Sequence, residues 1–245
     1  MRTIVLGSTS GIGRAVAVAL AASGADVIVH GRSSRNEAED VASSISGMGR
    51  KSAILMADLA DRFAGDQLVE EAWSLWGGLD AWLQLAGADT LTGPAAKLSF
   101  DAKLDLLWSV DVVATIRLCR RVGQRMVSQG SGSIVTMGWD QAETGMEGDS
   151  GELFAATKGA ILAFTRSLAL SLAPKVRVNA LAPGWIKTAW GQDASQTWQD
   201  RVIDETPLAR WGTPEDVAAA ACFLVSDAAA FLSGQVIRVN GGAVR

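Results

Sequence analysis

Seven residues near the start of the chain have the composition of a turn that binds phosphate groups. This turn, GSTSGIG, follows the apolar run Ile4–Leu6 and precedes an apolar helix that begins near Gly11. Gly7 allows a tight exit from the strand, Gly11 lets a pyrophosphate approach the backbone, and Gly13 lets the helix pack closely on the sheet. Free N–H groups and the positive end of the helix dipole then receive the phosphates. The sequence therefore predicts a dinucleotide site at Gly7, Ser8, Thr9, Ser10, Gly11, Ile12 and Gly13, although an ordinary strand–helix turn can look similar.

The residues after the second predicted strand distinguish between two dinucleotides. A site that selects NAD usually has an Asp or Glu there to bind the ribose 2′-hydroxyl, whereas this chain has His30-Gly31-Arg32-Ser33. Arg32, with Ser33 and with Arg35 as a further candidate, can make charge-assisted contacts with a 2′-phosphate. We therefore expect NADP(H) rather than NAD(H), the alternative being an arginine in a solvated loop.

Strands and helices alternate along the whole chain, and every motif discussed here follows the end of a predicted strand. Predicted strands lie at 4–6, 26–30, 52–56, 79–85, 133–137, 176–180 and 235–239, and predicted helices from 11, over 35–48, 61–76, 100–129, 151–172 and 214–224. Such alternation predicts an α/β fold, with a doubly wound parallel sheet and helices on both faces. Ligands of such sheets bind at the carboxyl ends of the strands, near the point where the strand order reverses.

Composition and length narrow the class of protein. The 245 residues carry 49% hydrophobic residues and a net charge of −4 with both signs scattered, which fits one domain over 1–245 that binds neither nucleic acid nor an anionic membrane. Cys119 and Cys222 lie in apolar helical stretches, so we expect a cytoplasmic protein with reduced thiols. No apolar run reaches the roughly 18 residues of a membrane span. With one histidine and no ligand-spaced cysteine pair, no metal site is expected.

Taken together, these segments resemble the short-chain dehydrogenase/reductase family, and most closely its 3-oxoacyl-acyl-carrier-protein reductase-like branch. The matching segments are GSTSGIG at 7–13, DLAD at 58–61, LAG at 85–87, GSIVTMG at 132–138, Lys158, RVNALAPGWIKT at 177–188, PLARWGTPEDVA at 207–218 and SGQVIRVNGG at 233–242. The resemblance implies a Rossmann-like single domain and a homo-oligomer, a tetramer or a dimer.

The resemblance also implies which residues contact the cofactor. Residues 7–13 would hold the pyrophosphate, Asp58 and Leu59 the adenine, and Ala86 and Gly87 the ribose. Pro183, Gly184, Ile186 and Thr188 would surround the nicotinamide, and Lys158 would bind its ribose. For Asp58 a more ordinary use exists, since the segment also offers Asp61 as the N-cap of the next helix.

Three of the four catalytic positions of the family differ in this chain. The family's tyrosine lies four residues before the lysine, and Phe154 occupies that position in a chain that contains no tyrosine. Trp139 occupies the position of the serine and Asp111 that of the helical asparagine, so only Lys158 is retained. A phenyl ring donates no proton, and an indole offers only one N–H group.

A replacement for the missing acid can be sought among the carboxylates nearby. Residues 139–154 contain five acidic residues and no basic one, and burial against Trp139 and Phe154 could raise the pKa of one of them. Asp140, which follows the serine position, is the first candidate, before Glu152 and Asp111. Glu152 would point away from the Phe154–Lys158 helix face. Asp111 could pair with Lys158, directly or through water. A solvated acidic loop is the alternative.

Four tryptophans lie in the loops expected beside the substrate: Trp139, Trp185, Trp190 and Trp198. Indole rings suit a planar or apolar small molecule, so we expect a tryptophan-lined cleft, unless the rings only pack a lid. Residues 189–206 resemble the family's mobile lid over the substrate.

Three hypotheses about function follow from these observations. The first is an NADP(H)-dependent oxidoreductase acting on a carbonyl or hydroxyl group, with a rebuilt acid. The second is a catalytically silent dinucleotide-binding protein, acting as a sensor or as a partner in an oligomer. The third is a lyase or isomerase that uses the acidic-loop carboxylates. Fold analogy alone does not separate them.

Overall fold

Seven short apolar strands pair in parallel to form one sheet in the computed structural model, which describes residues 1–244. The strands are β1 (Arg2–Leu6), β2 (Asp26–Gly31), β3 (Ser52–Met56), β4 (Ala81–Gln84), β5 (Gly132–Met137), β6 (Val176–Pro183) and β7 (Val236–Val239). Their spatial order is β3-β2-β1-β4-β5-β6-β7. The chain therefore moves outward from β1 in one direction and then from β4 in the other, which opens a crevice at the carboxyl ends of these two strands.

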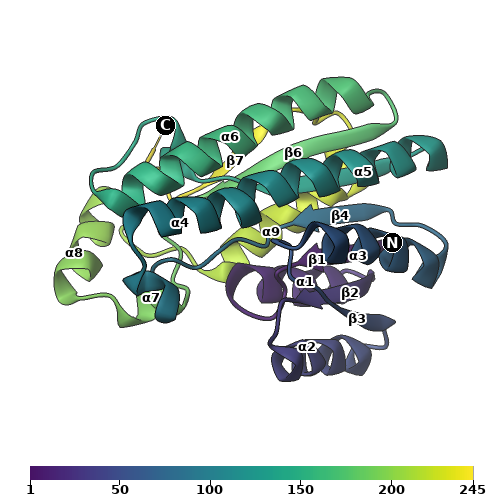
Figure 1. The fold of residues 1–245 in the computed structure, drawn as a ribbon, viewed down its shortest axis with the longest axis horizontal. Coiled ribbons are helices and arrows are strands. Elements are labelled where there is room, and N and C mark those ends of the chain that lie inside the picture. Colours follow the sequence, from purple (N-terminus) through teal and green to yellow (C-terminus); the bar gives the residue numbers. More distant parts are fainter. Residues whose placement is uncertain (245) are drawn as a thin grey trace.

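Helices cover both faces of the sheet (Figure 1). One face carries α1 (Gly11–Ala22), α2 (Arg35–Gly47) and α9 (Pro214–Val225). The other carries α3 (Arg62–Trp76), α4 (Phe100–Leu107), α5 (Ala114–Gln129) and α6 (Asp149–Leu172). Two short helices, α7 (Ala189–Asp193) and α8 (Gln196–Glu205), project beyond the carboxyl ends of the strands (Figure 1). The expected doubly wound α/β fold is confirmed.

Alternate side chains of each strand enter two separate apolar cores. Val5 packs with residues of α1 and α9, whereas its neighbours Ile4 and Leu6 pack with residues of α3, α5 and α6. All three side chains are fully buried. Because both faces of a parallel sheet are covered, its strands contain near-continuous apolar runs, as β1 does here.

The long helix predicted over 100–129 is interrupted. Residues Trp108–Val113 form a π-helical segment between α4 and α5, and Asp111 lies within it. A π turn widens the helix by one residue, and such turns occur mostly at functional sites. The sequence shows no proline or glycine there, so the apolar periodicity alone could not locate this change.

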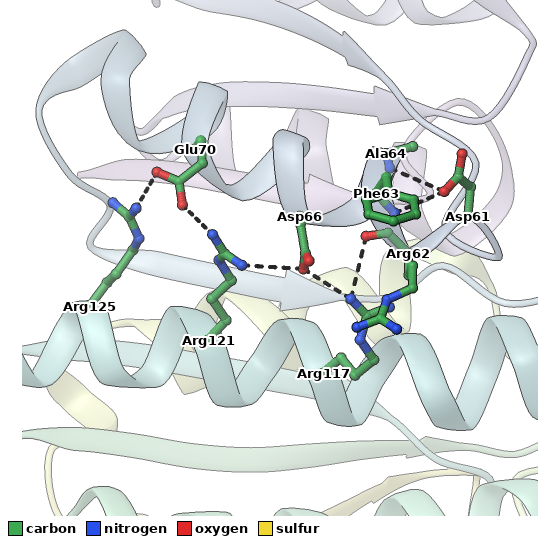
Figure 2. A network of polar contacts seen from close by, with 9 residues as sticks. All are labelled: Asp61, Arg62, Phe63, Ala64, Asp66, Glu70, Arg117, Arg121 and Arg125. Carbon is green, nitrogen blue, oxygen red and sulfur yellow. Dashed lines mark hydrogen bonds and ion pairs between the residues drawn. The ribbon is translucent and has the colours of Figure 1, made fainter.

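An ion-pair ladder joins α3 to α5 on the outer surface (Figure 2). Arg117, Arg121 and Arg125 lie one turn apart on α5. Arg117 and Arg121 contact Asp66 at 3.1 and 3.4 Å, and Arg121 also contacts Glu70 at 2.6 Å. Glu70 accepts a further bond from Arg125. The ladder fixes the register of the two helices.

The helix α6 is long and apolar enough, with a mean hydropathy of 1.3, to meet the length and composition criteria of a membrane span. Within this fold it packs on β6, α5 and the π-helical segment, and ten of its residues are buried. Its apolar character is accounted for by its position in the core.

Candidate functional site

The predicted phosphate turn lies between β1 and α1. Gly7 has φ +75°, and a Cβ atom there would lie 2.7 Å from the Cα atom of Ala86. A Cβ atom on Gly13 would overlap the carbonyl oxygen of Gly7. Both positions therefore require glycine, in agreement with the expected tight turn and close helix packing. The N-cap residue Ser10 makes no side-chain capping bond, so the first N–H groups of α1 stay available for an anion.

A cavity of about 630 Å³ opens beside this turn, at the carboxyl ends of the strands. Its walls come from the phosphate turn and from the segments 30–34, 57–59, 85–89 and 188–190. Thirteen residues expected at a cofactor line it: Gly7, Thr9, Ser10, Gly11, Ile12, Gly13, Arg32, Ser33, Asp58, Leu59, Ala86, Gly87 and Thr188. Segments far apart in the sequence thus converge on one cavity of a size that suits a dinucleotide.

Five other expected contacts lie outside the cavity lining, among them Lys158, which is described below together with Asp111. Ser8 is fully buried, and its backbone N–H and hydroxyl oxygen both bond to the backbone of His30 instead. Pro183 ends β6 in the core, and Ile186 is buried with only 7% exposure. Gly184 lies against Asn240 and Asp140.

Arg32, Ser33 and Asp58, which the sequence analysis expected at the adenosine of a cofactor, line the cavity beside the ends of β2 and β3. Arg32 and Ser33 are exposed, and Arg32 makes no ion pair within residues 1–244. Arg35 instead pairs with Glu39 at 3.8 Å, so it is engaged elsewhere. Asp58 stays exposed in the cavity wall, because Asp61 caps α3 by accepting bonds from Phe63 and Ala64.

At the other end of the cavity, Asp111 and Lys158 form a buried ion pair. The Nζ atom of Lys158 lies 2.6 Å from Oδ2 of Asp111, and Oδ1 of Asp111 accepts a bond from the backbone N–H of Ala88 at 2.8 Å. A Cβ atom on Gly87 would lie 3.0 Å from Oδ2 of Asp111. The direct pairing raised as a possibility from the sequence is therefore observed, immediately behind the cavity wall.

Two aromatic rings occupy the positions that the family resemblance assigns to hydroxyl groups. Trp139 and Phe154 are both half-buried and meet edge to face, with ring centroids 6.3 Å apart. An edge-to-face pair of this kind is stabilised by the aromatic quadrupoles. The two side chains provide an apolar surface and a single N–H donor.

The remaining candidate acids differ in where they lie. Asp140 is 1% exposed, its Oδ2 accepts a bond from Asn240 at 3.1 Å, and its Oδ1 has no partner within residues 1–244. Burial raises the pKa of Asp140, against the opposing effect of the Asn240 bond. Its carboxylate faces Asn240 and Gly184, away from the cavity lining. Glu152 is exposed, because α6 begins at Asp149 and so places Glu152 in its first turn.

Two glutamates of the acidic loop pair with arginines from distant segments. Glu143 bonds to Arg166 at 2.6 Å and to Arg238 at 2.7 Å, and Glu147 bonds to Arg201 at 2.8 Å. Bonds from these guanidinium groups lower the pKa of both glutamates. These two carboxylates are therefore ionised and paired, and Arg201 joins helix α8 to the loop.

Four indole rings cluster at the segment 189–206, which contains Trp190 and Trp198 and is flanked by Trp185 and Trp211. Trp185 stacks on Trp190 at 6.0 Å and contacts Trp198 at 5.4 Å, while Trp190 also contacts Trp211 at 6.0 Å. Trp190 lines the cavity. Trp211 was not among the tryptophans expected here, since it follows the segment 189–206 in sequence. The fold places its ring 6.5 Å from that of Trp185.

His30 is a second residue that the sequence analysis did not assign to the site. It is 2% exposed and contacts both the phosphate turn and the end of β3. Burial lowers the pKa of His30 to about 4, so its ring is neutral at pH 7. The sequence signal that could have identified it was its position near the end of β2, two residues before Arg32.

Comparison with known proteins identifies the family of this chain. Residues 7–244 match the family model described as enoyl-(acyl carrier protein) reductase. The chain is 34% identical to a 3-oxoacyl-acyl-carrier-protein reductase of Aquifex aeolicus over 98% of its length and 96% of that protein. Against the corresponding Staphylococcus aureus reductase the identity is 31%, with 98% and 96% covered.

Solved structures show the same fold. A putative NAD(P)-dependent gluconate 5-dehydrogenase of Beutenbergia cavernae with bound NADP is 35% identical, with a TM-score of 0.88 and coverage of 99% of this chain and 96% of that one. A 7α-hydroxysteroid dehydrogenase in complex with NADH is 28% identical, with a TM-score of 0.90 and coverage of 99% and 94%. From its sequence, sheet order and cavity, the chain belongs to the short-chain dehydrogenase/reductase family of oxidoreductases.

Proposed function

We propose that this protein binds NADP(H) in the 630 Å³ cavity and transfers hydride to or from the carbonyl or hydroxyl carbon of a small molecule. The observation that carries the proposal is the convergence of the phosphate turn, Arg32 and Asp58 on one cavity. The Lys158–Asp111 pair lies behind the wall of the same cavity, where Asp111 contacts Ala88. A nicotinamide, when bound, supplies or accepts the hydride. Everything else in the reaction is left to the side chains of this chain.

Arg32 supports NADP(H) as the cofactor. Its guanidinium group is exposed at the mouth of the cavity, and it makes no ion pair within the described residues. Guanidinium groups bind phosphate in a planar, bidentate manner, which suits a 2′-phosphate. The phosphate turn would hold the pyrophosphate, and Asp58 and Leu59 the adenine. NADP bound to the Beutenbergia cavernae protein is consistent with this assignment.

Lys158 and Asp111 would provide the polar group at the reactive end. The Nζ atom of Lys158 keeps two N–H donors beyond the one that it shares with Oδ2 of Asp111, and ribose hydroxyls are suitable acceptors. Asp111, held by the Ala88 N–H, would keep the Lys158 side chain in place. A proton needed by the substrate oxygen would then come from Lys158 Nζ, or from the Asp140 carboxyl after a movement of its loop. Glu152 is the least supported candidate, because it is exposed.

The substrate would bind between the lid, residues 189–206, and the apolar pair of Trp139 and Phe154. Trp190 connects this region to the cavity. A planar or apolar small molecule suits these rings. We also propose a homo-oligomer, because the layer α4–α6 exposes large apolar side chains, among them Trp108 at 45% and Leu170 at 82%. Light scattering of the purified protein tests its mass.

The experiment that tests the function has two stages. Calorimetric titration with NADPH and NADH tests binding, and the expected result is a tighter complex with NADPH. Oxidation of NADPH is then followed with a panel of ketones, and the Lys158→Met variant should lose any turnover found. Absence of binding to both cofactors would contradict the proposal.

Binding without turnover would instead favour the second candidate, a catalytically silent dinucleotide-binding protein. The observation behind that candidate is the replacement of two hydroxyl positions by the rings of Trp139 and Phe154. In that case Lys158→Met should weaken NADPH binding and change nothing else.

A further inference from the structure

His30 lies at the junction of the three strand ends that form the adenosine half of the cavity. Its Nδ1 atom accepts a hydrogen bond from the backbone N–H of Gly7 at 3.1 Å, and its Nε2 atom lies 3.2 Å from the carbonyl oxygen of Ala57. Because Nδ1 accepts a bond, the ring proton lies on Nε2, which then donates to Ala57. One neutral imidazole therefore connects the end of β1 to the end of β3.

The backbone of His30 makes two further hydrogen bonds to the phosphate turn, both with Ser8. Its carbonyl oxygen accepts a bond from the N–H of Ser8 at 2.9 Å, and its own N–H donates to the hydroxyl oxygen of Ser8 at 2.9 Å. The first two N–H groups of the phosphate turn are thus directed back toward the sheet. The N–H groups of residues 9–13 have no acceptor within residues 1–244 and remain free for a ligand. His30 divides the turn into an anchored part and a binding part.

The Nε2 side of the ring contacts the cavity wall opposite the phosphate turn, at the end of β3. Ala57 is bonded at both of its backbone groups, through its N–H to Gly31 at 3.0 Å and through its carbonyl oxygen to His30. The next residue, Asp58, lines the cavity where an adenine would lie.

We propose that His30 is a positioning residue for the cofactor, which sets the distance between the pyrophosphate turn and the adenine wall through its two ring nitrogens. The inference rests on the proposed cofactor binding. It predicts that His30 contributes equally to the binding free energies of NADPH and NADH, because both cofactors contain the same adenosine diphosphate portion. Arg32, by contrast, would distinguish the two.

Three substitutions of His30 test the hydrogen bonds of its two ring nitrogens separately. His30→Phe keeps a flat ring and removes both bonds. His30→Asn offers an amide oxygen near the Nδ1 position, so it can still accept the Gly7 N–H, and His30→Gln offers an amide N–H near the Nε2 position, so it can donate to Ala57 only. Thr165→Val is the matched control, because it removes a buried bond to Thr136, 2.7 Å long, that does not line the cavity.

The measurements are calorimetric Kd values for NADPH and NADH together with the thermal midpoint of each variant. His30→Phe should raise the Kd values for both cofactors by about tenfold or more. The ratio of the two Kd values should stay within about twofold of the wild-type ratio. His30→Asn, which keeps the bond to Gly7 in the phosphate turn, should recover more of the affinity than His30→Gln, which keeps only the bond to Ala57. Thr165→Val should lower the thermal midpoint without changing either Kd.

The outcomes that contradict the proposal are distinct. A folded His30→Phe protein with wild-type Kd values would show that the ring serves stability alone. Equal losses in His30→Asn and His30→Phe would show that the Gly7 bond is not the positioning contact. If His30→Phe does not fold, the comparison of the Asn and Gln variants decides. A wild type that binds neither cofactor overturns the proposed function and this inference together, whereas binding that His30 does not affect overturns only the inference.

Discussion

The ammonium nitrogen of Lys158 lies 2.6 Å from Oδ2 of Asp111, with the two side chains 10% and 1% exposed. A water-excluded pair of this kind stabilises each charge by the other, and removal of one partner leaves an uncompensated buried charge. The pair also replaces an arrangement in which, by the family resemblance, an asparagine would accompany the lysine.

The first prediction concerns the stability of this pair. Asp111→Ala should lower the free energy of unfolding by about 3–5 kcal/mol, because it leaves Lys158 buried without a partner. Asp111→Asn should cost less, since its amide oxygen can still accept the Ala88 N–H. Urea denaturation of both variants, of Lys158→Met and of the double variant Asp111→Asn/Lys158→Met measures the coupling. A double variant as unstable as the sum of the single changes would mean that the pair is not coupled in solution.

The second prediction uses the single histidine of the chain. Because the folded protein lowers the pKa of His30 from 6.5 to about 4, the unfolded chain takes up a proton on His30 at a higher pH than the folded protein does. This contribution to stability is complete above about pH 6.5 and is lost as the pH falls toward 4, by about 3 kcal/mol in total. Urea denaturation at a series of pH values should show a shallower decline between pH 6.5 and 4 for His30→Asn. Equal slopes would indicate that the imidazole titrates normally in the fold.

Asp140 should show the opposite pH dependence. Its pKa is raised by burial, so the folded protein binds a proton on Asp140 more tightly than the unfolded chain does. The ionised carboxylate therefore reduces stability at neutral pH, and this penalty decreases as the pH falls through the raised pKa. Asp140→Asn should unfold at a higher urea concentration than the wild type at pH 7, and the advantage should diminish in acid. The reverse order would show that the unpaired Oδ1 has a partner in solution.

The fourth prediction concerns cofactor choice. Arg32→Ala should weaken the binding of NADPH by roughly 10- to 100-fold, because a bond between charged groups contributes about 1.5–3 kcal/mol. The affinity for NADH should stay nearly unchanged. Arg35→Ala is the control, since Arg35 pairs with Glu39 and should not affect the ratio. Equal affinities of the wild type for NADPH and NADH would remove the basis for Arg32 as the selecting residue.

The fifth prediction concerns the chemistry of the family's own substrates. Wild-type protein should reduce 3-oxoacyl thioesters poorly, because Phe154 and Trp139 carry no hydroxyl group. The double variant Trp139→Ser/Phe154→Tyr should gain activity, by up to about 10²–10⁴-fold for a positioned acid. The gain is measured as NADPH oxidation with an acetoacetyl thioester, with each single variant as the comparison. Rapid turnover by the wild type would show that another group already supplies the proton.

Much of the fold follows from local patterns in the sequence. Apolar runs such as Ile4–Leu6, each followed by a glycine or polar turn and a helix, specify parallel strands, because only buried strands with helical crossovers satisfy that alternation. Gly7 and Gly13 specify the phosphate turn, since no other residue fits those two backbone positions. The two-helix lid and the π-helical segment carry no comparable local signal.

The sequence by itself determined the strand–helix alternation and the phosphate turn, and through the family resemblance it predicts Phe154, Trp139 and Asp111 at the family's catalytic positions. Only the tertiary structure decided how the charges are paired. Asp111 contacts Lys158 from within a π-helical segment, Asp140 contacts Asn240, and Glu143 and Glu147 pair with arginines from other segments. These pairs join residues between 23 and 100 positions apart. The physical reason is that the state of a carboxylate depends on its burial and its neighbours, which are set by packing between distant segments.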